Sequence, residues 1–107
     1  MPILLNERKA LEGLRRKLLK NYRLLDFRIY GSKAKGTDME DSDLDVMIVL
    51  EELTPQIESK IDDLVFEVNL EYGCLITPLY FGREELEVGP LSESPVYKKA
   101  LQEGISL

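Results

Sequence analysis

The spacing of apolar residues predicts three helices along the chain. Over residues 6–22 the leucines recur at intervals of three, four and seven positions, which places them on one stripe of an amphipathic helix with Asn6 as its N-cap. A second stripe runs through residues 54–72, where a proline suits the first helical position and the glycine that follows suits a helix end. A shorter helix is expected over residues 94–103, because it has the same two signals.

Three other segments have the pattern of strands. Residues 24–30 alternate apolar and polar side chains before a glycine. The apolar positions of this segment are Leu25, Phe27 and Ile29. Residues 44–50 are a nearly continuous aliphatic run, which is typical of a central strand buried on both faces. Residues 74–81 are expected to form the third strand, and Pro78 places it at an edge or at a bulge.

The order of these elements predicts an α/β (α+β) fold with a three-stranded mixed sheet flanked by about four helices. Residues 82–90 are acidic and rich in turn-forming residues, so they are expected to form a connection. A chain of 107 residues is too short for two well-buried cores. We therefore expect a single domain over residues 1–107.

Composition narrows the classes of function. The apolar residues are 44% of the chain and the charged residues 32%, as in a soluble folded protein. No apolar run reaches the roughly 18 residues that a membrane helix needs, and the first residues lack the layout of a signal peptide, so the cytoplasm is the expected location. With one cysteine, Cys74, and no histidine, the common zinc ligand sets are missing. An oxygen-ligated metal such as magnesium, manganese or calcium remains.

The formal net charge of -6 argues against a broad electrostatic surface for DNA or RNA. Binding to nucleic acid depends on neutralising many phosphates with lysine and arginine, and this chain carries 14 such residues against 20 acids. A nucleotide or a protein is therefore the expected partner.

A candidate anion site follows the first predicted strand. The strand runs into Gly31 and Ser32, where a glycine lets the backbone approach an anion and free N–H groups, with the serine hydroxyl, can hold phosphate oxygens. Lys33 and Lys35 come directly afterwards and could add positive charge. An ordinary turn followed by solvated lysines is the alternative interpretation.

A candidate metal site opens the second predicted strand. Asp43 and Asp45 are two residues apart, so both side chains are expected on one face of the strand, with the aliphatic residues on the other. Two neighbouring carboxylates repel each other, and a bound divalent cation keeps both ionised. A solvated acidic loop over residues 38–43 is the alternative. A helix-loop-helix calcium loop is excluded, because Val46 stands where that loop requires glycine.

The combined pattern resembles a known family. A Gly-Ser step, about ten residues, and then Ser-Asp-Leu-Asp before an aliphatic strand resemble the signature of the DNA polymerase beta-like nucleotidyltransferase superfamily. They are most similar to its minimal branch, whose members include antitoxins paired with HEPN-domain toxins. The resemblance implies the small nucleotidyltransferase fold and transfer of AMP from ATP to a protein hydroxyl, such as a tyrosine of a HEPN toxin. It also implies two Mg²⁺ ions held by Asp43 and Asp45, and a phosphate site at Gly31 and Ser32, with Lys33 or Lys35 adding charge.

The chain departs from the family pattern at one position. Active members carry a third carboxylate on a neighbouring strand, whereas residues 74–81 offer only the hydroxyls of Thr77 and Tyr80, and Glu71 lies before that strand. Three functions therefore stay open: an active transferase, a binding module that neutralises or scaffolds a protein partner without catalysis, and one subunit of a larger transferase. A homodimer is compatible with all three.

Overall fold

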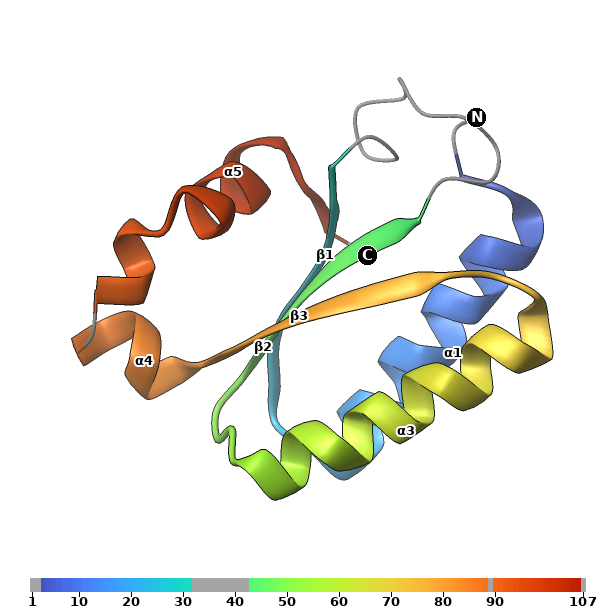
Figure 1. Cartoon of the computed structure of the whole chain (residues 1–107), viewed down its shortest axis with the longest axis horizontal. Coiled ribbons are helices and arrows are strands. Elements are labelled where there is room, and N and C mark those ends of the chain that lie inside the picture. The colour runs from blue at the N-terminus through green and yellow to red at the C-terminus, as the bar shows by residue number, and fades with distance from the viewer. Residues whose placement is uncertain (1–2, 32–42, 89, 107) are drawn as a thin grey trace.

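A four-stranded mixed sheet lies at the centre of the fold (Figure 1). The structure is a computed structural model that describes residues 3–31, 43–88 and 90–106. The strands lie in the order β3-β2-β1-β4, in which β1 is antiparallel to both β2 and β4, and β2 is parallel to β3. Their bounds are β1 Leu24–Tyr30, β2 Leu44–Leu50, β3 Ile76–Gly82 and β4 Ile105–Ser106.

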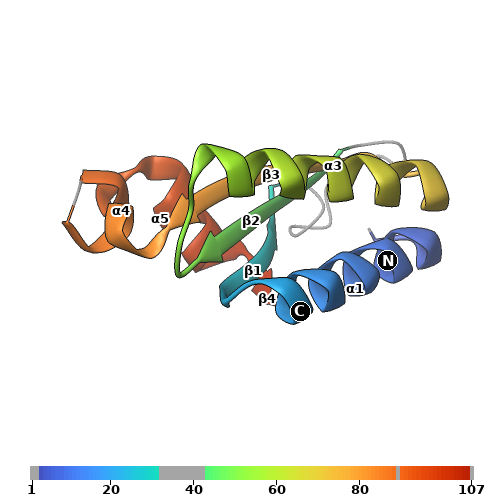
Figure 2. The same ribbon diagram turned by 90° about the horizontal axis from the view of Figure 1, so that it is seen from below.

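Helices cover both faces of the sheet. One face carries two long antiparallel helices, and Figure 2 shows them side by side in front of the strands. The other face carries two shorter helices and a 3-10 turn. The long helices are α1 (Leu5–Asn21) and α3 (Pro55–Tyr72), and the shorter elements are α4 (Arg83–Val88), η1 (Pro90–Glu93) and α5 (Pro95–Glu103).

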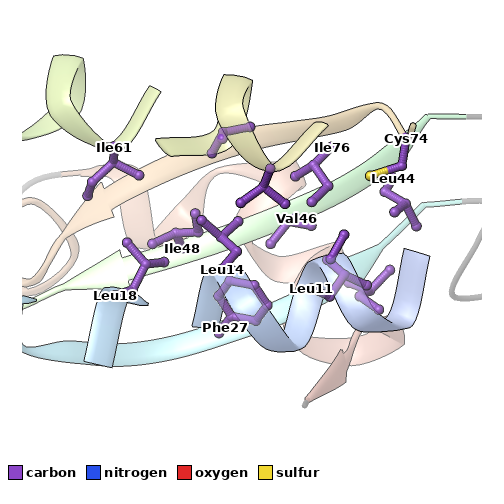
Figure 3. Close-up of a cluster of buried hydrophobic side chains, with 14 of the residues drawn as sticks. Leu11, Leu14, Leu18, Phe27, Leu44, Val46, Ile48, Ile61, Cys74 and Ile76 are labelled. Atoms are coloured by element: carbon purple, nitrogen blue, oxygen red, sulfur yellow. The ribbon is translucent and has the colours of Figure 1, made fainter. Parts of the chain in front are cut away.

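The larger part of the core lies between the sheet and the two long helices (Figure 3). Leu14 and Leu18 of α1 are fully buried and pack with Phe27, Val46 and Ile48 of the sheet. Each fully buried side chain of this size contributes roughly 1.5–3 kcal/mol relative to an exposed one. The cluster therefore fixes how the sheet sits on α1 and α3.

The second predicted strand agrees with β2, residue for residue. Of its seven residues all but Asp45 are buried, because β2 has a strand on each side and helices above and below. Pro78 lies in β3, which is an edge strand of the described sheet, as the sequence predicted.

The helix signals were correct for α3 and only partly correct for α1. The Thr54 hydroxyl accepts the N–H of Ile57 at 3.1 Å, and Gly73 ends α3 in the left-handed conformation with φ 64°. The expectation that Asn6 caps α1 was wrong. Leu4 occupies the N-cap position, and the Asn6 amide instead donates to the carbonyl of Tyr72 at 2.9 Å, which joins the start of α1 to the end of α3.

Three other expectations need correction. Leu25 does not share a face with Phe27, because the pairing of β1 shifts register between Leu24 and Asp26; Leu25 is consequently 48% exposed. Residues 82–90, expected to be a connection, include α4. The sheet has four strands rather than three, since the chain after α5 pairs through β4 with Arg28 and Ile29. In the described part of the chain, no helix is long and apolar enough to cross a membrane.

Candidate functional site

Asp43 and Asp45 lie at the N-terminal end of β2, on the face of the sheet that α5 covers further along. Met47 and Val49, which follow Asp45 at alternate positions, pack with Ala100 of α5, whereas Val46 belongs to the core on the other side. The Asp43 side chain is exposed and that of Asp45 is partly buried. The two carboxylates therefore emerge together where the α5 side of the sheet opens to solvent.

Gly31, the residue that follows β1, lies directly against the carboxylate of Asp45. Its φ is +78°, a conformation that residues with a side chain rarely adopt. A Cβ atom at this position would lie 2.7 Å from Oδ2 of Asp45, so the backbone can pass the carboxylate only without a side chain. The candidate anion turn and the candidate metal site therefore meet at one point. Ser32, Lys33 and Lys35 lie outside the described residues.

Tyr30 faces Asp45 across the antiparallel pair of β1 and β2. Burial raises the pKa of Tyr30, and the negative charge of Asp45 raises it further. The pKa of Asp45 is raised as well, first by burial and then by the charge of Asp43. Both shifts mean that additional positive charge here is favourable, whether as a proton or as a bound cation.

Thr77 lies on the other side of Asp45, because β3 pairs Thr77 with Asp45 in the parallel register. Its hydroxyl donates to Oδ2 of Asp43 at 3.4 Å. The residue of β3 nearest the carboxylate pair is thus a threonine. Tyr80, the other hydroxyl of this strand, donates instead to Oδ1 of Asp62 on α3 at 2.5 Å, and burial is the main reason that its pKa is raised.

Glu71 has a different neighbour. It is exposed at the end of α3, and its carboxylate raises the pKa of the Tyr72 hydroxyl. Glu71 thus interacts with Tyr72. The carbonyl of Tyr72 accepts a hydrogen bond from the Asn6 amide of α1.

The donor set suits a hard cation held by few protein ligands. Two carboxylates supply oxygen ligands, as magnesium prefers, and magnesium usually keeps several waters and is completed by substrate phosphates. Within residues 3–31, 43–88 and 90–106, no group of three or more histidine, cysteine, aspartate or glutamate side chains is arranged to hold a metal. The arrangement fits a magnesium ion bound jointly by Asp43, Asp45 and the phosphates of a nucleotide.

Pairing across strands identifies two neighbours of the site that the sequence did not single out for it. Tyr30 appeared only as the last residue of a strand, and Thr77 only as a hydroxyl on a strand lacking acids. Both are placed beside Asp45 by the register of β1 and β3 with β2. The sequence placed each residue in a predicted strand but could not show that it lies beside Asp45, because register depends on pairing between distant segments.

Known proteins are similar to this chain over most of its length. The profile of the family described as nucleotidyltransferase domain matches residues 8–104. Among solved structures, a protein assigned as a minimal nucleotidyltransferase has a TM-score of 0.64 and 22% identity, covering 94% of this chain and 91% of that one. A toxin–antitoxin crystal structure with AMP-PNP has a TM-score of 0.63 and 14% identity, covering 96% of this chain and 72% of the other. No curated protein matches the chain.

Proposed function

The chain belongs to the nucleotidyltransferase domain family, and from this premise we propose that it is a magnesium-dependent transferase that moves AMP from ATP to a hydroxyl of a protein. Its fold is the small nucleotidyltransferase fold. The observation that carries the proposal is the contact of Gly31 with Asp45, where a side chain on the glycine would meet the carboxylate. This contact brings Gly31, the first residue of the proposed phosphate site, beside a carboxylate that we propose binds metal.

In this proposal the site residues would divide the work of such a transfer. Asp43 and Asp45 would hold magnesium, which would offset the charge of the triphosphate and assist ionisation of the acceptor hydroxyl. The backbone after β1 would hold the terminal phosphates, with Ser32, Lys33 and Lys35 as further candidates. The hydroxyl oxygen would then bond to the α-phosphorus while the bond to the bridging oxygen breaks, which yields the AMP ester, pyrophosphate and a proton.

A protein acceptor fits what the chain offers around Asp45. The carboxylate pair lies at the N-terminal end of β2 and is open to solvent at Asp43, so a second molecule can approach it. We propose that this molecule is a HEPN toxin and that the chain is its antitoxin. The fold similarity to a toxin–antitoxin assembly with AMP-PNP supports both a nucleotide and a protein partner.

A binding module without turnover is the second candidate, and the position of Thr77 favours it. The neighbour of Asp43 on β3 is a hydroxyl that cannot serve as a charged metal ligand or as a strong base at neutral pH. Loss of a general base typically lowers rates by factors of about a hundred to ten thousand. In this alternative the chain would neutralise or scaffold its protein partner by covering it.

Calorimetric titration with ATP, with and without magnesium, tests the nucleotide site. We expect heat of binding that depends on magnesium and disappears in the Asp43→Ala, Asp45→Ala double variant. The Glu84→Gln variant, which changes an exposed acid on α4, is the matched control and should bind as the wild type does. Absence of binding by the wild type in both conditions would overturn the proposal.

A second experiment separates transfer from simple covering of the partner. The chain and a co-encoded HEPN protein would be expressed together, and the mass of the HEPN protein measured. Transfer predicts an increase equal to one or more AMP groups, lost in the double variant together with neutralisation. A binding module predicts an unchanged mass and neutralisation that survives the double substitution.

A further inference from the structure

Three large apolar side chains are exposed on the outer face of the layer that α1 and α3 form. Leu5 of α1 is 69% exposed, and Phe66 and Leu70 of α3 are 65% and 69% exposed. Phe66 and Leu70 are one helical turn apart, on the exposed side of α3 and away from its buried stripe of Ile61, Val65 and Val68. They therefore point away from the sheet. Figure 2 shows the two helices in front of the strands.

These side chains gather at one end of the layer. The hydrogen bond from the Asn6 amide to the carbonyl of Tyr72 joins the first turn of α1 to the last turn of α3. Leu5 and Leu70 consequently lie at the same height along the two antiparallel helices. A cluster of exposed apolar side chains among charged residues is typical of an interaction surface.

The two helices carry opposite charges. α1 contains six lysines and arginines against two glutamates, a formal charge of +4. α3 contains five acids against one lysine, a formal charge of -4. The layer as a whole is therefore neutral, and the net charge of -6 comes from the rest of the chain. A surface made of one positive and one negative stripe is complementary to itself when its two stripes are exchanged.

Twofold symmetry supplies that exchange. When two such layers are stacked face to face around an axis parallel to the helices, each α1 lies on the α3 of the other copy, at the same height. Counting inwards along both helices from the contact of Asn6 with Tyr72 brings Arg16 of one copy close to the height of the partner's Asp63, an exposed acid of α3. Positive residues of α1 thus meet acids of α3 twice in every pair, while the apolar cluster is buried at one end.

From this geometry we propose that the outer face of the α1–α3 layer is a self-association surface, which binds a second copy of this chain in a symmetric dimer with each α1 on the partner's α3. The surface is on the opposite face of the sheet from the side chains of Asp43 and Asp45, so the proposal is independent of the nucleotidyltransferase activity.

The edge of the sheet on the β1 side offers a poorer route to self-association. Beyond its pairing with β4, the exposed edge of β1 includes Phe27, whose N–H donates to Oδ1 of Asp26 at 2.9 Å. The same carboxylate accepts the Arg28 side chain at 2.8 Å. A strand edge whose donor is already satisfied, with a charged pair beside it, resists addition of another strand.

Sedimentation equilibrium of the full chain tests the surface directly. We expect a dimer that forms over concentrations from about 1 to about 200 µM, the range of weak to moderate interfaces. Phe66→Glu and Leu70→Glu should each weaken dimerisation about tenfold or more, because each buries a charge in the apolar cluster. Val88→Glu is the matched control: Val88 is 81% exposed on α4, across the sheet, and this variant should dimerise like the wild type. Circular dichroism would check that all three variants are folded.

Charge reversal makes the test specific to the pairing of α1 with α3. One variant carries Lys9→Glu and Arg16→Glu, which takes the formal charge of α1 from +4 to 0 beside an acidic α3; the other carries Asp63→Lys and Glu67→Lys, which takes α3 from -4 to 0 beside a positive α1. Each variant alone should be monomeric, and an equal mixture should form a heterodimer, since one contact then keeps +4 against -4 and in the other the new glutamates of α1 meet the new lysines of α3. A monomeric wild type at the highest concentration, or a dimer that Phe66→Glu leaves unchanged, would overturn the proposal.

Discussion

At the scale of single residues, Gly31 is the position where one added methyl group should abolish ATP binding. A control substitution at a second glycine separates this effect from the loss of stability. In Gly31→Ala the new methyl group would lie 2.7 Å from Oδ2 of Asp45 at a φ of +78°, so either the turn or the carboxylate must move. We expect loss of at least about 1 kcal/mol of stability from the backbone conformation, together with loss of magnesium-dependent ATP binding. Urea unfolding and calorimetry measure the two effects.

Gly73→Ala is the control for this substitution. Gly73 also has a positive φ, of +64°, but a Cβ atom there would have no neighbour within 4 Å. The control should lose a similar amount of stability and keep its ATP binding. If Gly31→Ala bound ATP as well as Gly73→Ala does, the turn after β1 would have no part in the site.

At Thr77 a substitution can add a charged metal ligand to the candidate site instead of disrupting the site. Thr77→Asp would place a third carboxylate on the strand beside Asp45, where the present hydroxyl lies 3.4 Å from Oδ2 of Asp43. Magnesium affinity should rise by about tenfold or more, because affinity for such ions increases with the number of charged ligands. Without magnesium the melting temperature should fall, as three like charges repel. Thr77→Asn, which adds a neutral group of similar size, should produce neither effect in the same calorimetric and thermal measurements.

At the scale of elements, the two proline-started helices differ in how they are capped. The Thr54 hydroxyl accepts the N–H of Ile57, so Thr54→Ala should cost about 1 kcal/mol in urea unfolding. Ser94 occupies the same position before α5, but its side chain makes no capping hydrogen bond. Ser94→Ala should therefore change stability by clearly less. Equal losses in the two variants would mean that the hydrogen bond is not what stabilises the start of α3.

Elements with strong local signals were predictable from the sequence, and elements that depend on distant pairing were not. Each strong signal is carried by a few neighbouring residues. Examples are the aliphatic run of β2, the Thr-Pro pair at the start of α3 and the glycine, Gly73, at its end. By contrast, β4 has two residues, which are too few to show any periodicity. They form a strand because they pair with the edge of β1. The register shift that exposes Leu25 likewise depends on how β1 meets β2.

The same distinction applies to the candidate site. The spacing of Asp43 and Asp45 predicted that both face one way, since side chains alternate along a strand. The contact of Asp45 with Gly31 could not be derived from spacing alone, because it depends on the antiparallel register that sets Tyr30 opposite Asp45. Thr77 comes from a strand more than 30 positions later and reaches Asp43 only through the parallel pairing of β3 with β2.

At the scale of the whole molecule, the candidate site should lower the stability of the free protein and raise that of the bound one. The pKa of Asp45 is raised above its ordinary value of 3.8 by burial and by Asp43. A carboxyl whose pKa is higher in the folded than in the unfolded chain opposes folding once it is ionised, so this cost is absent below about pH 3.8 and is complete above the raised pKa of the folded protein. Asp45→Asn removes the charge with little change of shape. We therefore expect the variant to unfold at a higher urea concentration than the wild type when magnesium and ATP are absent. The control variant Glu84→Gln, which changes an exposed acid on α4, should unfold like the wild type.

With magnesium and ATP at about a hundred times the dissociation constant, the wild type should gain about 2.7 kcal/mol of stability and the Asp45→Asn variant nothing, which reverses their order. If the wild type were the more stable protein in both conditions, Asp45 would be part of the scaffold and not a ligand of a bound ion.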